Sequence, residues 1–242
     1  MKERVFNLIA EKIGGGIDAE YGIQGFCIVD DYIVIAVVVD GRAKIYLVDK
    51  NTFQIYDSID IGENHANVLS YDPVDKVVFV GNTGQPPVTL GIKDNQLSQI
   101  ENKCKRKGQV LYNEQNDLFI VTNGTSDGTT TNVYTREQFY DSNSEPSQSF
   151  IMPGLDGYGP QGKTTYGNHI YFCLSKEEGE NAIAVYNINT GQLEQTIYDD
   201  TKKGTNSELE QAYFDEEGNM HTNYNNGNEI YKTNYNYYEQ VK

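Results

Sequence analysis

The sequence predicts an all-β domain built from five repeats of four short strands. Aromatic and β-branched side chains, which favour pleated strands, are abundant: Tyr occurs 19 times and Phe 9 times, against 3 Met. Short runs of these residues are interrupted at intervals by Gly, Asn, Asp and Pro, the residues of tight turns. The same order of strand, tight turn, strand, loop, strand, hairpin and strand recurs along the 242 residues.

The first repeat illustrates this order. A strand at 26–29 turns through two Asp residues into a second strand at 32–39, and strands at 44–48 and 54–61 follow. Turn residues stand at matching places in the later repeats, which chance alternation would not produce. The predicted first strands of the five repeats begin near Phe26, Val68, Gln109, Lys163 and Gln211.

Repeats of about 40–50 residues, each with four strands, are typical of the blades of a β-propeller. We therefore predict one domain over 1–242, a five-bladed β-propeller of four-stranded antiparallel blades. The N-terminal segment 4–13 is expected either to close the ring as a fourth strand of the fifth blade or to form a short helix, because its apolar residues fit both patterns. The predicted blades cover approximately 22–62, 63–104, 105–154, 158–200 and 206–242.

Two third-strand hairpins carry a family resemblance. The segments Ile45-Tyr-Leu-Val-Asp-Lys-Asn-Thr-Phe53 and Val185-Tyr-Asn-Ile-Asn-Thr-Gly-Gln-Leu193 are similar to the repeats of YVTN-type and NHL-type β-propellers. The WD dipeptide and the paired glycines of kelch repeats are missing, and the chain has 0 Trp, so neither of those subfamilies is supported. The resemblance implies a propeller and leaves the ligand open.

Net charge and cysteine content limit which classes of partner and which kinds of site are expected. The net charge of -16 repels phosphate backbones and anionic lipids, so neither nucleic acid binding nor membrane insertion is expected. The 3 Cys residues have no CxxC spacing, which argues against a zinc site or a disulfide framework. Few Lys and Arg together with abundant Asn and Tyr favour an extracellular, cell-surface or virion protein of bacterial or phage origin over a cytoplasmic one.

The propeller resemblance implies a rim where the loops entering the first strands meet the loops that join second and third strands. Amides and carboxylates, which suit sugar hydroxyls, gather on this predicted rim beside an aromatic ring that can stack on a sugar face. We predict a non-enzymatic binding or structural module that presents this rim to a glycan, a peptide or a partner subunit. In the alternative interpretation the same side chains form hydrogen bonds with one another and with bound water, and so fill the channel. The predicted ligand-binding residues are Gln24, Arg42, His65, Asn67, Tyr158, Gln161 and Glu210.

Two other functions are compatible with the sequence. A glycoside hydrolase or lyase would use Glu208, Glu210 and His65, although hydrolysis needs two carboxyls facing across the bond and here both come from one repeat. A scaffold would contact its partner through outer blade edges, near Tyr237 and Tyr238. A strongly raised carboxyl pKa in a deep cleft would favour the enzyme.

No cofactor is expected. One alternative is a calcium ion, because Asn67 and Glu210 together with backbone oxygens would offer it the oxygen ligands that it prefers. A related alternative is a metal held by His65 with Glu208 or Glu210 across the channel.

Overall fold

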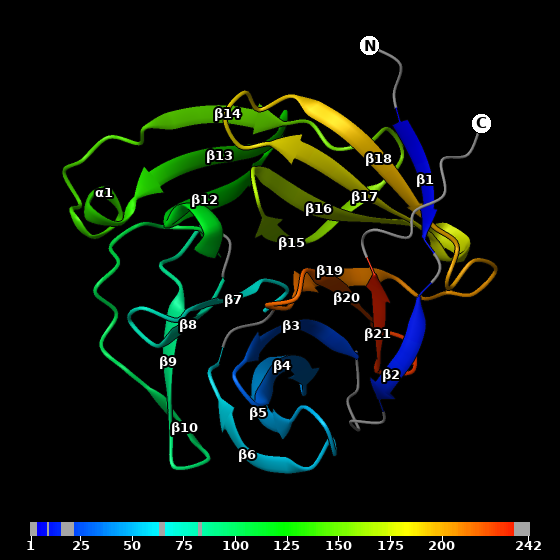
Figure 1. The fold of residues 1–242 in the computed structure, drawn as a ribbon, viewed down its shortest axis with the longest axis horizontal. Helices are drawn as coiled ribbons and strands as arrows, with labels where there is room; N and C mark the ends of the chain where they lie inside the picture. Colours follow the sequence, from blue (N-terminus) through cyan, green and yellow to red (C-terminus); the bar gives the residue numbers. More distant parts are fainter. Residues whose placement is uncertain (1–3, 9, 16–21, 63–65, 82–83, 235–242) are drawn as a thin grey trace.

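A computed structural model describes residues 4–8, 10–15, 22–62, 66–81 and 84–234, and shows five blades arranged in a ring (Figure 1). Each blade has four antiparallel strands, so the predicted fold class is confirmed.

The strands follow the blades in chain order, except that the last strand of blade five comes from the N-terminal segment. Blade one contains β3 (Ile23–Val29), β4 (Tyr32–Val39), β5 (Arg42–Asp49) and β6 (Ile55–Asp60); blade two contains β7 (Leu69–Asp72), β8 (Val77–Val80), β9 (Val88–Lys93) and β10 (Gln96–Gln99). Blade three contains β11 (Gln109–Asn113), β12 (Leu118–Thr125), β13 (Gly128–Thr135) and β14 (Gln148–Met152); blade four contains β15 (Gly159–Tyr166), β16 (His169–Lys176), β17 (Glu180–Asn187) and β18 (Leu193–Asp199); blade five contains β19 (Leu209–Phe214), β20 (Asn219–Tyr224), β21 (Glu229–Asn234) and β2 (Glu11–Gly15).

The first strand of each blade faces the centre of the ring. β3, β7, β11, β15 and β19 contact one another in this order, and β19 contacts β3 to close the circle (Figure 1). A helix, α1 (Arg136–Tyr140), and two single 3₁₀ turns interrupt the described strands. No helix among the described residues has the length and apolar character that a membrane span requires.

The N-terminal segment closes the ring as strand rather than helix. β2 pairs antiparallel with β21 and is the outermost strand of blade five, which confirms the strand alternative of the sequence prediction. The structure differs in one respect, because β1 (Arg4–Leu8) pairs parallel with β18 at the outer edge of blade four. The segment therefore covers the outer strands of two neighbouring blades, whose backbone groups would otherwise be free to pair with another chain.

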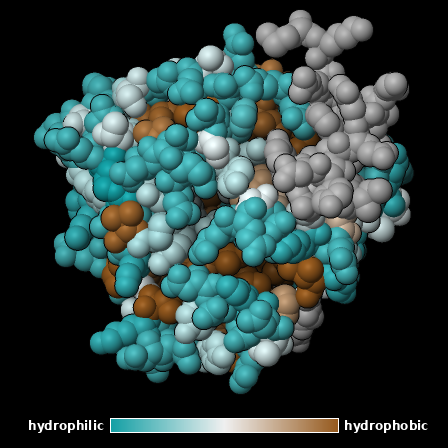
Figure 2. All heavy atoms as spheres, in the orientation of Figure 1, coloured by the Kyte–Doolittle hydropathy of each residue, from teal (hydrophilic) through white to brown (hydrophobic). Residues whose placement is uncertain are grey.

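The hydrophobic core lies between the blades. Among the described residues, apolar side chains form five clusters, and each cluster joins two adjacent blades. Between blades two and three, for example, the rings of Phe79 and Phe119 lie edge to face at 6.0 Å, and Phe139 of α1 stacks on Phe119 at 4.0 Å. Figure 2 shows that hydrophilic side chains cover most of the face seen in Figure 1, with hydrophobic ones visible in small separate areas.

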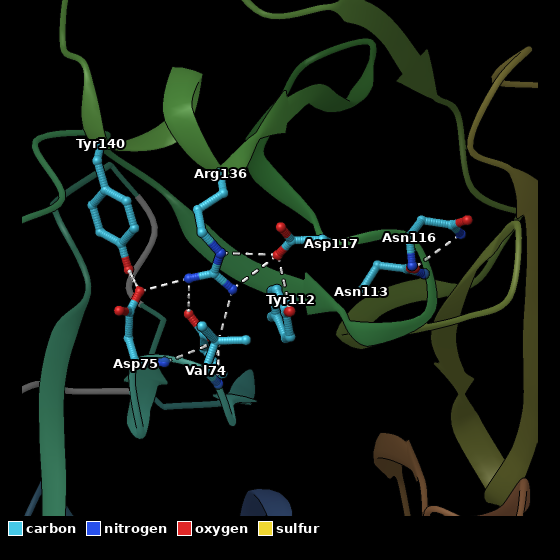
Figure 3. A network of polar contacts seen from close by, with 9 residues as sticks. Val74, Asp75, Tyr112, Asn113, Asn116, Asp117, Arg136 and Tyr140 are labelled. Carbon is cyan, nitrogen blue, oxygen red and sulfur yellow. Dashed lines mark hydrogen bonds and ion pairs between the residues drawn. The ribbon is translucent and has the colours of Figure 1, made fainter.

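An arginine network fastens blade three to blade two (Figure 3). Arg136 Nη1 donates to Asp72 Oδ2 at 2.7 Å and to Asp75 Oδ2 at 2.6 Å, while Nε donates to Asp117 Oδ1 at 2.9 Å. The Tyr140 hydroxyl also donates to Asp75, at 2.9 Å. Asp72 is fully buried, so the guanidinium supplies the counter-charge that a buried carboxylate needs.

One amide side chain links four blades at the axis. Gln211 of β19 is fully buried, and its Oε1 accepts hydrogen bonds from the backbone N–H groups of Phe26 at 3.0 Å and Leu69 at 3.2 Å. Its Nε2 donates to the carbonyl of Leu69 at 2.9 Å and to that of Lys163 at 3.1 Å. Space is tight here: a Cβ on Gly162 would lie 2.2 Å from the carbonyl oxygen of Asn67. These four bonds satisfy backbone groups that the blades themselves leave unpaired.

We expect Gln211→Leu to lower the free energy of unfolding by about 3–5 kcal/mol, because it leaves several buried backbone groups without partners. Gln99→Leu makes the same change at an exposed position of β10 and should cost less than about 0.5 kcal/mol. Urea unfolding followed by circular dichroism measures both values. Equal losses in the two variants would contradict the assigned role of Gln211.

Candidate functional site

Three first strands carry an irregularity where they enter the ring. The pairing register shifts between Ile23 and Gly25, between Pro160 and Lys163, and between Leu209 and Gln211. Such β-bulges turn a side chain out of the regular strand pattern and are frequent beside functional sites. The residues inside these bulges include three that the sequence predicts for the rim: Gln24, Gln161 and Glu210.

A cavity of about 430 Å³ lies between blades three and four, and we call it the blade 3–4 pocket. It gathers three predicted ligand-binding residues, Asn67, Tyr158 and Gln161. Apolar side chains of β14 and β16 form part of its wall, and the hairpin that joins β12 to β13 contributes polar groups at the exposed side. Its other lining residues include Gln109, Ser126, Asp127, Met152, Lys163, Phe172 and Leu174.

Lys163 lies on the buried side of this pocket. Only 4% of the residue is exposed, and its Nζ is 4.3 Å from the centre of the Phe172 ring. Nζ donates to Gln109 Oε1 at 3.0 Å and more weakly to the carbonyl of Gln161 at 3.4 Å. Burial lowers the pKa of Lys163 from its ordinary value of 10.5 to about 8, because the charged form loses hydration. The amine therefore changes its charge close to neutral pH.

The partner of Lys163 is held in one orientation by its own neighbours. Gln109 Nε2 donates to Asn67 Oδ1 at 2.8 Å, and the Thr122 hydroxyl donates to Gln109 Oε1 at 3.4 Å. With the amide nitrogen engaged in this way, Oε1 faces Lys163. Asn67, Gln109 and Lys163 thus form a chain of polar contacts across blades two, three and four.

Glu210 is the second ionisable group with a strongly shifted pKa at the inner strands. Only 3% of it is exposed, and burial raises the pKa of its carboxyl from 4.5 to about 8. The charge of Glu208 adds to this rise, and a hydrogen bond with Asn225 opposes it. Burial therefore favours the neutral, protonated form of Glu210.

The two carboxyls of the hydrolase alternative occupy different surroundings. Glu208 is exposed, accepts from Asn225 Nδ2 at 2.8 Å, and lines a separate cavity beside β16. Glu210 is buried and is absent from the lining of that cavity.

The remaining predicted residues lie elsewhere. Arg42 is exposed on blade one, where its guanidinium is 3.6 Å from Asp60. Gln24 is buried and lines none of the cavities described above. His65 and the predicted scaffold residues Tyr237 and Tyr238 lie outside the described residues.

The calcium site of the sequence analysis stays a prediction. Within the described ranges no group of three or more His, Cys, Asp or Glu side chains is placed to hold a metal ion. Of the two residues named for calcium, Asn67 accepts a hydrogen bond from Gln109 through its Oδ1, and Glu210 is buried.

Sequence reasoning missed the residues that hold the centre together. Gln109, Lys163 and Gln211 lie on three successive first strands, β11, β15 and β19, near the predicted start of each. A long polar side chain at the same point of three repeats was the signal that could have found them.

Comparisons with known proteins place the chain by fold. No family model matches it, and no curated protein matches its sequence. Among solved structures, the glutaminyl cyclase of Myxococcus xanthus is similar with a TM-score of 0.71 and 11% identity, over 100% of both chains. A tail fiber of Staphylococcus aureus phage P68 is similar with a TM-score of 0.63 and 14% identity, over 93% of this chain and 52% of that one. Likeness at these identities shows the fold alone. The chain itself is a five-bladed β-propeller, and a polar pocket lies beside its inner strands.

We expect the buried carboxyl of Glu210 to make stability depend on pH. Because its folded-state pKa of about 8 lies above its ordinary value of 4.5, its contribution is complete below pH 4.5 and is lost as the pH rises through 8. Glu210→Gln keeps the shape and removes the charge, so at pH 8 it should be more stable than the wild type by roughly 4 kcal/mol, with little difference at pH 4.5.

Urea unfolding at the two pH values measures this difference. Glu101→Gln is the control, since it makes the same change on an exposed side chain after β10 that does not contribute to the Glu210 pKa shift. A Glu210→Gln variant whose stability follows the wild type at both pH values would show that Glu210 ionises normally.

Proposed function

We propose that the chain is a recognition module that binds a saccharide in the blade 3–4 pocket. The observation that carries this proposal is the convergence of three amide side chains, Asn67, Gln109 and Gln161, on one cavity that also contains the ring of Tyr158. Amides offer donors and acceptors side by side, which is the pattern that adjacent sugar hydroxyls require. An aromatic ring beside them provides an apolar face on which a sugar ring can stack.

The size of the pocket fits this class of ligand. Its volume of about 430 Å³ lies within the range of about 300–1,000 Å³ that is usual for small-molecule sites. The hydroxyls of Thr125, Ser126 and Thr129 add further hydrogen-bonding groups to the lining. A lining that exposes more polar than apolar surface favours a saccharide over a hydrophobic ligand.

The Gln109 amide of the pocket is positioned before any ligand arrives. Gln109 is fixed by Asn67 and Thr122, and Gln161 lies in the bulge of β15. Groups that are already oriented lose little conformational entropy on binding, which favours affinity. The likeness of a phage tail fiber is compatible with a binding or structural module and adds no ligand.

We expect Asn67→Ala and Gln161→Ala each to weaken saccharide binding about tenfold, the usual effect of one lost hydrogen bond to a ligand. Arg42→Ala, on the rim of blade one, is the control and should bind normally. Calorimetry with fractionated bacterial envelope polysaccharides measures the affinities, and parallel titrations with calcium and with a chelator test the calcium prediction. If neither the wild type nor any variant binds a polysaccharide, saccharide recognition is refuted. If both pocket variants bind with the wild-type affinity, the binding site lies elsewhere.

A second candidate is an enzyme that uses Glu210, because a carboxyl with a pKa of about 8 can donate a proton at neutral pH. The similar propeller from Myxococcus xanthus is named a glutaminyl cyclase, so a peptide with N-terminal glutamine is the first substrate to try.

For this candidate we expect ammonia release from the glutaminyl peptide by the wild type, loss of that release in Glu210→Gln, and retention in Glu208→Gln. Mass spectrometry of the peptide follows this reaction. The hydrolase alternative is tested by measuring new reducing ends in envelope polysaccharides that have been incubated with the protein. A peptide and polysaccharides that both remain intact would exclude these two reactions.

A further inference from the structure

We propose that Lys163 gives the blade 3–4 pocket a subsite for a carboxylate, so that the saccharide it prefers carries a uronic acid. This inference rests on the proposed saccharide recognition and specifies the class of sugar.

The first argument is charge balance around Lys163. Both hydrogen-bond acceptors of its Nζ, Gln109 Oε1 and the Gln161 carbonyl, are neutral. In the described part of the chain no carboxylate forms an ion pair with it, and the Phe172 ring face is a weak substitute. A buried ammonium without an anionic partner is unfavourable, and a ligand carboxylate would supply that partner.

The second argument is the remaining hydrogen-bonding capacity of the amine. A lysine ammonium has three donors, and Nζ has two acceptors, one of them distant at 3.4 Å. Since Lys163 lines the cavity, a carboxylate inside it can accept at least one charge-assisted hydrogen bond.

The third argument is the placement of the opposite charge. Asp127 lines the same pocket from the exposed hairpin between β12 and β13, whereas Lys163 is buried. An acidic sugar is therefore repelled at the outer side and attracted at the inner side, which orients its carboxylate toward Lys163. Its hydroxyls then face Asp127 and Ser126, which can accept hydrogen bonds from them.

The net charge of -16 gives this subsite a distinctive salt dependence. The field of the whole protein repels an anionic ligand, and salt screens that field over about 8 Å at physiological ionic strength. The contact with the buried Lys163 is screened much less. Raising the ionic strength from low to physiological should leave the affinity for an acidic sugar unchanged or increase it, whereas an ion pair with an exposed lysine would weaken.

The affinity should also depend on pH. A carboxylate binds the ammonium form of Lys163, so affinity should fall as the pH rises through about 8. Two other titratable groups on the elements packed around Lys163 are Cys173 of β16, whose thiol burial keeps protonated, and Glu210 of β19, whose carboxyl also changes its charge near pH 8. The Asp127 carboxylate lies at the outer side of the pocket, on the β12–β13 hairpin. A neutral sugar should show no such change.

The test compares two disaccharides that differ only in ending with glucuronate or with glucose, titrated into the full chain by calorimetry. We expect the wild type to bind the glucuronate form about tenfold more tightly. Lys163→Met should bind the two forms with equal affinity, because the charge that distinguishes them is gone. Lys176→Met removes an exposed lysine 5.8 Å from the Tyr158 ring and should keep the preference. Thermal unfolding of each variant confirms that it is folded.

The outcomes separate this inference from the proposed function. Equal binding of both disaccharides by the wild type, or a glucuronate preference that survives in Lys163→Met, would overturn the carboxylate subsite and leave saccharide recognition standing. Absence of binding for both would refute the proposed function. A short peptide with a free C-terminal carboxylate that binds more tightly than the glucuronate form would overturn the choice of a sugar.

Discussion

The closeness of five innermost strands at one axis is the constraint on which the structure depends. The ring is narrow enough that one side chain, Gln211, reaches backbone groups of blades one, two and four, as well as belonging to blade five. Glycine at Gly25 and Gly162 is required because a Cβ there would lie within 3 Å of backbone or of Gln211. At this level of the axis one amide packs against main-chain atoms of three other blades and joins the blades by direct hydrogen bonds.

The cavity that gathers predicted ligand-binding residues lies beside these central strands. The blade 3–4 pocket opens next to the axis, and the contacts from Asn67 through Gln109 to Lys163 connect it to the central strands. The same burial that gives the axis its packing shifts the pKa values of Lys163 and Glu210 to about 8 from opposite directions. Ionisable groups with such values gather at functional sites more often than elsewhere, because keeping them buried costs stability.

The fold could be predicted from the sequence more completely than the site. Turn residues between short apolar runs indicated five four-stranded units, and Asn67, Tyr158 and Gln161 of the predicted rim do line one pocket. Lys163 and Gln109 were missed, since a polar residue at a strand beginning is usually solvated and nothing local shows that these two face each other across blades. The parallel pairing of β1 with β18 was missed for a similar reason: short N-terminal strands of this kind carry no pattern that selects one blade edge over another.

By itself, then, the sequence determined the repeat, the number of strands in each blade and the acidic surface, because alternation, turn chemistry and net charge are local or additive properties. Only the tertiary structure decided which polar side chains meet, which of them are buried, and which carboxyl and amine have shifted pKa values. Those properties arise from desolvation and from contacts between residues far apart in the chain, such as Gln211 with Leu69 and Lys163 with Gln109, and they exist only once the ring has closed.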